Sequence, residues 1–586
     1  MASKRSDIGA VYYTSVKPKE SWSVSATPRV LTRSWKTKAQ EYAASDGIAA
    51  RVYVLAAVAV VLSGIALRVY AFLLNRPLWL DEAMLALNIT TRSYGELLQP
   101  LAFDQWAPPL FLWLERFVVE TAGVSEATLR FIPLLAGLAM VVLAWPVARY
   151  FLGNRDAIFA TAILALQLTL SRYATEVKPY GTDAFVTMMV LGLLVFVLGS
   201  PVSRWRWLCL IIGGGLALTF SHPALFVLAG VPAALIMDRR TRQSPAFRMR
   251  LVSLCLAWAL VFVVMYATLY TAGTNDAYLA RYWEGSYLLR MLGAERTWLR
   301  GAVFCTGLVV FWRRNQSAAV AALAVPILAL GMAAAVHAYP LTTRLMVFLA
   351  PISAVAYASA LGFALSLVPR SRQLATFGFL LAAMAARQIY YVDRYLGSTI
   401  NSEDSRELVE WISRERHGAP VYVNAFGAPA WAFYTTDWTS PDPVRLDWFE
   451  SVLSSRGVAF ANRPSRHRTV INEGAEIQFE WQSGIDLVGI GTGMEYRNAK
   501  GHLQPRPDPG WASNEIARIR RVAAPFAWVL LSHYTESQQY ELLAALEIVG
   551  GRVLESASRS GAAAYRVCFP THQRDAQSTL ANACST

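Results

Sequence analysis

Residues 52–82 read VYVLAAVAVVLSGIALRVYAFLLNRPLWLDE, an apolar run followed at once by two acids. The run from Val52 to Leu74 is long enough to cross a bilayer, which takes about 20 apolar residues. Asp81 and Glu82 follow just beyond its end. Adjacent carboxylates are costly next to lipid, so their position favours a function at the membrane surface.

The composition indicates a polytopic α-helical membrane protein. Of 586 residues, 55% are hydrophobic and only 16% are charged, whereas a soluble domain carries about a quarter charged residues. The net charge of +14 comes largely from the N-terminal segment and from short loops between apolar runs, where a topology signal belongs. This distribution argues against nucleic-acid binding.

Spanning-length apolar runs, read with loop charge, predict about eleven transmembrane helices. Each loop expected to face inside carries at least two arginines, beginning with Arg149 and Arg155. The first helices are expected at about 52–74, 127–148, 156–173 and 180–199, and the last emerges near Tyr390. The odd number places the chain beyond it outside the cytoplasm, so we expect a multi-pass membrane protein.

Three parts are predicted, namely a basic cytoplasmic tail (1–51), a transmembrane module (52–391) and an extracytoplasmic α/β domain (392–586). In the last part, strands at Val421–Val423, at 526–531 and at 565–568, with a helix from Glu536 to Val549 between the last two, give strand–helix–strand order. Cys568 and Cys584 could pair there or stay free.

The first outer loop, about 75–126, is expected to hold two short helices. Ser93 and Glu96 form a capping-box pattern before Leu97. Pro108-Pro109 then precedes about fourteen residues up to Glu120, a length that suits a helix lying in the membrane interface.

Asp81 and Glu82 are the first candidate site residues. The functional interpretation is a general base beside a second carboxylate that places an acceptor or, with Asp81, binds a divalent cation such as Mg²⁺ or Mn²⁺. The structural alternative is that the pair caps the start of a helix, a place that Asp favours.

The segment from Glu176 to Asp183 supplies a matching cation, Lys178. Pro179 suits the first turn of a helix, so Lys178 and the free amides of that helix start would face one outer space. Such an arrangement binds phosphate well. A Lys that merely snorkels to the surface beside a capped helix is the alternative. Together with the acids, Lys178 predicts chemistry on a lipid phosphate.

Further candidates lie at other outer helix ends. Arg344 could clamp a phosphate, whereas His222 and His337 could bond sugar hydroxyls or a leaving-group oxygen, although a lone His is more often structural. Asp104 and Gln105 could line the pocket from the loop. No zinc-ligand spacing and no glycine-rich nucleotide loop occurs, which argues against a nucleotide as direct substrate.

The chain resembles the GT-C superfamily of membrane glycosyltransferases, in the bacterial branch similar to protein mannosyltransferases and lipid A aminoarabinose transferases. The resemblance covers about residues 50–360. It rests on these stretches: Pro77 to Glu82, Trp106-Ala-Pro108-Pro109 to Trp113, Leu129-Arg130-Phe-Ile-Pro133, Tyr173 to Tyr180, Ser221-His222, and Tyr339 through Arg344 to Pro351.

The resemblance implies a polyprenyl-phosphate sugar donor, an inverting transfer to an acceptor hydroxyl on the outer face, and no required cofactor other than an optional divalent cation. It implies that Asp81 is the base and that Glu82 places acceptor or metal. The donor phosphate is then held by Lys178, Arg344 and Tyr180. The remaining substrate contacts are assigned to Asp104, Gln105, Glu176, Asp183, His222, His337 and Tyr339. Relatives often carry Arg where this chain has Lys178, and Lys lacks the two-pronged geometry of Arg.

Three other functions stay open. A flippase or transporter of lipid-linked sugars is one, although transporters usually show internal repeats and buried charges at midplane. An O-antigen-type ligase or polymerase is another, and it too would act outside on lipid-linked glycans. A membrane scaffold presenting its C-terminal domain is the third. Protein, lipid A, exopolysaccharide and other cell-envelope glycans all fit as acceptors.

Overall fold

The computed structural model describes residues 31–270, 297–392, 395–396, 403–424, 426–439, 488–490, 495–497, 503–505, 510–522, 526–534 and 536–570. The chain divides into two units, Met1–Val54 and Leu55–Thr586. Among the described residues, the first unit holds only the beginning of helix α1 (Leu31–Leu73). Helix α1 therefore begins within the segment predicted as a cytoplasmic tail.

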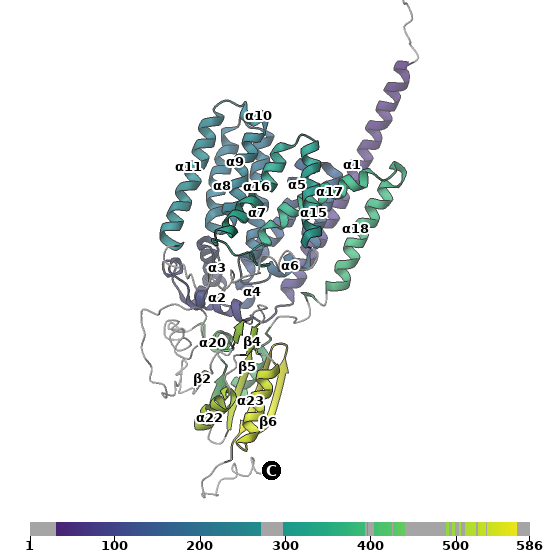
Figure 1. Cartoon of the computed structure of the whole chain (residues 1–586). Coiled ribbons are helices and arrows are strands. Elements are labelled where there is room, and N and C mark those ends of the chain that lie inside the picture. Colours follow the sequence, from purple (N-terminus) through teal and green to yellow (C-terminus); the bar gives the residue numbers. More distant parts are fainter. Residues whose placement is uncertain are drawn as a thin grey trace, which may run out of the picture. The chain divides into compact units, whose positions relative to one another are not determined.

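Long apolar helices make up most of the second unit, and they form where the apolar runs lie. The main ones are α5 (Phe131–Leu166), α7 (Tyr180–Gly199), α8 (Arg204–Phe220), α9 (Ala224–Met237), α11 (Phe247–Met265), α15 (Thr297–Arg313), α16 (Ser317–Ala335), α17 (Ala350–Ser366) and α18 (Arg370–Val392). Helix α5 packs against α7 and α17, and α9 packs along α16 (Figure 1). The predicted polytopic helical class is confirmed.

Six described helical stretches are long and apolar enough to cross a membrane, namely Arg51–Leu73, Phe131–Leu166, Tyr180–Gly199, Phe247–Leu269, Ser317–Ala335 and Val347–Ser366, and Ala224–Met237 is a shorter apolar helix. Within α5, the φ of 79° and ψ of 176° at Gly153 are not helical, so the element consists of two helices that meet at a kink. The kink lies between the predicted second and third helices, and the third predicted range continues past Leu166 into α6 (Leu168–Tyr173). The total of eleven membrane crossings stays a prediction.

Short elements fill the loop between α1 and α5, which the sequence predicts to lie outside. These are α2 (Leu80–Thr91), η1 (Glu96–Leu98), η2 (Ala102–Asp104), α3 (Pro109–Ala122) and α4 (Glu126–Leu129). The predicted capping box is present, because the Ser93 amide donates to the Glu96 carboxylate at 2.8 Å. Helix α3 occupies the range predicted for the second short helix, and its place in the membrane interface stays a prediction.

The C-terminal part contains a five-stranded sheet with the order β2-β1-β5-β7-β6. Its strands are β1 (Val421–Val423), β2 (Val488–Ile490), β5 (Phe526–Ser532), β6 (Arg552–Arg559) and β7 (Ala562–Cys568). Strand β1 runs parallel to β2 and β5, whereas β7 runs antiparallel to β5 and β6. A separate hairpin pairs β3 (Glu495–Arg497) with β4 (Leu503–Pro505).

Four helices accompany these strands, α19 (Arg406–Glu415), α20 (Ala428–Thr435), α22 (Trp511–Val522) and α23 (Glu536–Ile548). The predicted small α/β domain is therefore confirmed as a fold (Figure 1). Cys568 is disulfide-bonded, while Cys584, its predicted partner, lies outside the described residues.

One apolar core joins the outer loop to the C-terminal sheet. Its buried members include Leu85 and Phe111 from the loop and Trp431 and Trp528 from the C-terminal part. Because this core is shared, the outer loop is fixed from two sides, by the long helices and by the C-terminal sheet.

Candidate active site

Helix α2 places Asp81 and Glu82 in its first turn. Trp79 is the N-cap residue, so Asp81 occupies the second helical position rather than the cap that the structural alternative gave it. Glu82, at the third position, accepts from the Trp79 amide at 3.4 Å. Both acids lie where the helix leaves amide groups unsatisfied, and the helix dipole favours negative charge there.

The Glu82 carboxylate is engaged within the protein. Arg130 donates to it through Nε at 3.2 Å and through Nη2 at 2.8 Å, and the Val177 amide donates at 2.7 Å. Both charged side chains are almost fully buried, with 2% exposure for Glu82 and 3% for Arg130. Arg130 also donates to the carbonyls of Arg76 and Pro77. This network ties the start of α2 to the start of α5 and to the Lys178 segment.

Asp81 instead faces partly accessible space. Arg344 Nη1 lies 2.8 Å from its Oδ2, and the two side chains are 43% and 29% exposed. The same guanidinium lies 5.4 Å from the centre of the Trp79 ring. Burial by itself would raise the pKa of Asp81, but the charges of Lys178 and Arg344, with the Arg344 hydrogen bond, hold that pKa below its ordinary value. Asp81 is therefore ionised at neutral pH.

Lys178 is buried, and Gln105 accepts a hydrogen bond from its ammonium group. Burial lowers the pKa of Lys178, and the nearby charge of Asp81 opposes this shift. The next residue, Pro179, is the N-cap of α7. The structure thus brings together Asp81, Lys178, Arg344 and Gln105, which the sequence predicted as parts of one site.

Two further predicted residues, Glu176 and Tyr180, lie on either side of Lys178. Glu176 is buried and accepts from Arg172 Nε at 2.7 Å. Burial, followed by the charge of Glu82, raises the pKa of Glu176. The Tyr180 ring packs edge-on against Tyr173, with 5.4 Å between centroids. The Glu176–Arg172 hydrogen bond and the Tyr180–Tyr173 ring contact both hold the segment that carries Lys178 in place.

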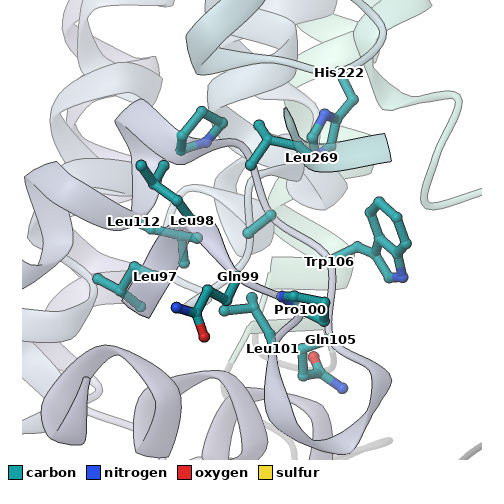
Figure 2. A pocket seen from close by; sticks show the side chains of 12 residues that line it. Leu97, Leu98, Gln99, Pro100, Leu101, Gln105, Trp106, Leu112, His222 and Leu269 are labelled. Carbon is teal, nitrogen blue, oxygen red and sulfur yellow. The ribbon is translucent and has the colours of Figure 1, made fainter. Parts of the chain in front are cut away.

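A small, partly open pocket lies beside Gln105 (Figure 2). Its wall is mainly apolar and includes Leu97, Leu98, Leu101, Trp106, Leu112 and Leu269. His222 lies across the pocket from this loop, and burial lowers its pKa to about 4, against the effect of a hydrogen bond with the Ala107 backbone. Gln105 therefore connects a largely apolar pocket to the Lys178 cation.

Among the other predicted residues, Tyr339, His337 and Asp183 have the following places in the structure. Tyr339 donates through its hydroxyl to the Leu345 carbonyl at 3.1 Å, a contact within its own loop. His337 is exposed at the end of α16, with a positive φ of 59°. Asp183 is buried in α7. The side chain of Asp104 lies outside the described part of the structure.

The structure adds two residues that sequence reasoning missed, Glu403 and His533. Glu403 Oε2 accepts from the Leu80 amide at 2.7 Å, and its Oε1 bonds His533 Nδ1. No local pattern marks either residue, since 323 positions separate Glu403 from Leu80. The sequence analysis named Arg130 only as part of a motif and did not predict its ion pair with Glu82. An arginine at the start of an apolar helix was the signal from which a buried ion pair could have been predicted.

A divalent cation does not fit Asp81 and Glu82 as they stand. Arg344 and Arg130 occupy the two carboxylates, and the second lies buried in its own network. Within the described ranges, no group of three or more His, Cys, Asp and Glu side chains could hold a metal ion. We therefore derive no step through a metal.

Part of the chain matches the model of a known protein family. Residues 107–266 match the model of the dolichyl-phosphate-mannose-protein mannosyltransferases. The predicted resemblance to GT-C glycosyltransferases of this type is confirmed. The match covers the stretch from α3 through α11, including Arg130 and Lys178. No curated protein matches the chain.

Two solved structures are similar at low identity. ArnT from Cupriavidus metallidurans, bound to undecaprenyl phosphate, is 14% identical, with a TM-score of 0.48 over 88% of this chain and 98% of that one. The oligosaccharyltransferase AglB from Archaeoglobus fulgidus, in complex with an inhibitory peptide and a dolichol-phosphate, is 14% identical, with a TM-score of 0.43 over 89% and 75%. Neither likeness transfers a role to a residue of this chain.

Proposed function

We propose that this multi-pass membrane protein transfers a sugar from a polyprenyl-phosphate donor to an acceptor hydroxyl, with inversion at the anomeric carbon. The matching family model supports a transferase of the GT-C type. The observation that carries the finer proposal is the arrangement at Asp81, an ionised carboxylate bonded to Arg344 and electrostatically close to Lys178.

The chemistry follows from these charges. The acceptor oxygen attacks the anomeric carbon while Asp81 takes the hydroxyl proton, and the bond from that carbon to the phosphate oxygen breaks. The lipid phosphate leaves with the electron pair. A positioned base contributes about 100- to 10,000-fold to such a step. Lys178 and Arg344 stabilise the departing anion, and fixed cations act strongly where water is scarce.

A polyprenyl-phosphate donor suits the surroundings of Lys178. The family description names a dolichyl-phosphate-linked sugar, and the pocket beside Gln105 has the apolar wall that a lipid or a sugar face needs. Arg344 pairs with Asp81 before substrate is present, so we propose that an entering phosphate draws Arg344 away and leaves the carboxylate to act as a base.

Glu82 has a different role in this proposal from the one the resemblance implied. Its carboxylate accepts bonds from Arg130, Val177 and Trp79. We therefore infer that Glu82 is a positioning residue, which holds the start of α2 against the segment that carries Lys178. Loss of either Glu82 or Arg130 would leave the other charge buried without a partner, which is costly. The pair therefore holds the start of α2 in place strongly.

The site is proposed to face the outside of a bacterial inner membrane. The arginine-rich short loops support this orientation by the positive-inside rule. We propose the same three parts as the composition indicates, with the catalytic module at 52–391 and an extracytoplasmic domain from 392 onward.

The experiment uses sealed membrane vesicles of known orientation and a radiolabelled polyprenyl-phosphate sugar. Transfer of label to envelope acceptors on the outer face supports the proposal. Movement of intact labelled lipid between leaflets without any transfer would contradict it and favour a flippase. Transfer of whole glycan chains rather than single sugars would favour a ligase or polymerase.

A further inference from the structure

Side chains from the C-terminal part accept hydrogen bonds from two backbone amides at the start of α2. The Leu78 amide donates to the Tyr434 hydroxyl at 2.8 Å, and the Leu80 amide donates to Glu403 Oε2 at 2.7 Å. The first amides of a helix lack a partner within the helix, and Asp81 directly follows Leu80 in the chain. The two bonds therefore hold the backbone that presents the Asp81 carboxylate.

The Tyr434 hydroxyl is fixed in direction by a second contact. It donates to Glu126 Oε1 at 3.2 Å, and the same carboxylate oxygen accepts from Arg406 Nη1 at 2.8 Å. Burial raises the pKa of Tyr434, so the hydroxyl keeps its proton and donates to Glu126 while it accepts from Leu78. A phenylalanine ring could make neither bond.

The Leu78 amide lies in an apolar core that both parts of the chain share. Leu78 is wholly buried. Helix α20, which carries Tyr434, packs against α2, and Trp431 and Phe433 of α20 belong to the same core as Leu78. A buried amide without a partner is costly because water does not reach it. Loss of the Tyr434 hydroxyl would leave the Leu78 amide in that state, so we expect the backbone there to shift.

A shift at the start of α2 would act on Asp81 and spare the cations around it. Asp81 Oδ2 lies 2.8 Å from Arg344 Nη1, and the charge of Lys178 acts on the same carboxylate. Both cations lie on other segments of the chain than α2. A displacement of about 1 Å can lower the rate of a reaction about 100-fold. The expected effect is therefore on the chemical step, with the groups assigned to the donor phosphate left in place.

We propose that Tyr434 and Glu403 are positioning residues of the Asp81 site, and that the C-terminal domain takes part in sugar transfer by holding the first turn of α2. This inference rests on the proposed function. It gives the C-terminal domain a part in the chemical step rather than in donor binding, since both residues act through the backbone beside Asp81.

The test measures sugar transfer and donor binding by the full-length protein in membranes, with a labelled polyprenyl-phosphate sugar. Tyr434→Phe keeps the ring and removes only the hydroxyl. Glu403→Ala removes the acceptor of the Leu80 amide, whereas Glu403→Gln keeps an oxygen that can accept from that amide. Tyr540→Phe is the matched control, because Tyr540 is an exposed tyrosine on α23 of the same domain.

We expect Tyr434→Phe and Glu403→Ala to lower the transfer rate at saturating donor about 10- to 100-fold, while the Kd for the donor stays within about twofold. Glu403→Gln should recover most of the rate that Glu403→Ala loses, and Tyr540→Phe should match the wild type. A wild-type rate in Tyr434→Phe would overturn the inference. A parallel loss of rate and donor binding would also overturn it, because it would show a general structural role.

Failure of the proposed function would look different. Absence of transfer by the wild type, or a wild-type rate in Asp81→Asn, contradicts the proposed function and, with it, this inference. Impaired transfer by Asp81→Asn together with a wild-type rate in Tyr434→Phe overturns the inference alone.

Discussion

Arg344 donates a 2.8 Å hydrogen bond to Asp81, across 263 positions of the chain. The pair joins the first outer loop to the loop that follows α16, and the Trp79 ring lies against the same guanidinium. The proposed base and the proposed phosphate ligand are thus in direct contact. Arg344 lowers the pKa of Asp81, which leads to a pH prediction.

Arg344→Gln should shift the pH dependence of transfer. The pKa of Asp81 is lowered, chiefly by Lys178 and then by Arg344, against the opposing effect of burial. Its carboxylate is the active form above that pKa and is lost as the pH falls through it. Removing Arg344 raises the pKa, so the acid limb of the kcat/KM profile should move to higher pH. Arg414→Gln, at an exposed position of helix α19, serves as the control, and an unmoved acid limb would show that Arg344 does not act on Asp81.

Lys178→Ala should lower transfer by about 100- to 1,000-fold, the usual effect of removing a charged group that stabilises an anion in a closed site. Lys178→Arg should recover only part of this loss, since Arg must replace a buried ammonium bonded to Gln105. The measurement is the initial rate at saturating donor. A wild-type rate in Lys178→Ala would contradict the proposal that Lys178 stabilises the departing phosphate.

The buried pair of Glu82 and Arg130 should matter for folding before it matters for chemistry. Arg130→Ala leaves Glu82 charged and unpaired, which costs about 3–5 kcal/mol. We expect a clear fall in the Tm of the protein in detergent. The double variant Glu82→Gln with Arg130→Met should regain much of this stability. A double variant no more stable than Arg130→Ala would contradict the pairing.

Gly181 should tolerate no side chain, because a Cβ there would lie 2.6 Å from the Tyr173 carbonyl oxygen. Gly181→Ala must displace the start of α7, and Lys178 with it, so transfer should fall while the protein remains in the membrane. Gly331→Ala is the matched control. Gly331 is an exposed helical glycine, and no atom lies within 4 Å of the position that a Cβ would take there, so alanine should stabilise by about 1 kcal/mol. Equal activity of the two variants would argue against a close fit at Tyr173.

The sequence predicted those features that depend on local pattern. Apolar runs marked the long helices, so the predicted range 180–199 coincides with α7. Strands at Val421 and Phe526 were recognisable as short apolar stretches between polar ones. Asp81, Lys178 and Arg344 could be grouped because each lies at an outer helix end, and topology brings such ends together.

Long-range pairing could not be predicted in the same way. Glu82 was expected to act together with Asp81. Successive side chains of a helix point about 100° apart, however, and the Glu82 side chain points to Arg130. Glu403 and His533 lie in a different part of the chain from Leu80, and only the shared apolar core brings them there.

The central claim is that Asp81 is the base. Its most direct test is the rate of sugar transfer by Asp81→Asn from a labelled polyprenyl-phosphate donor, with donor binding measured on the same preparation and Glu410→Gln, an exposed acid of α19, as the control. The account predicts a loss of about 100- to 10,000-fold in transfer, with donor binding retained and the control unchanged. Transfer by Asp81→Asn at the wild-type rate would contradict it.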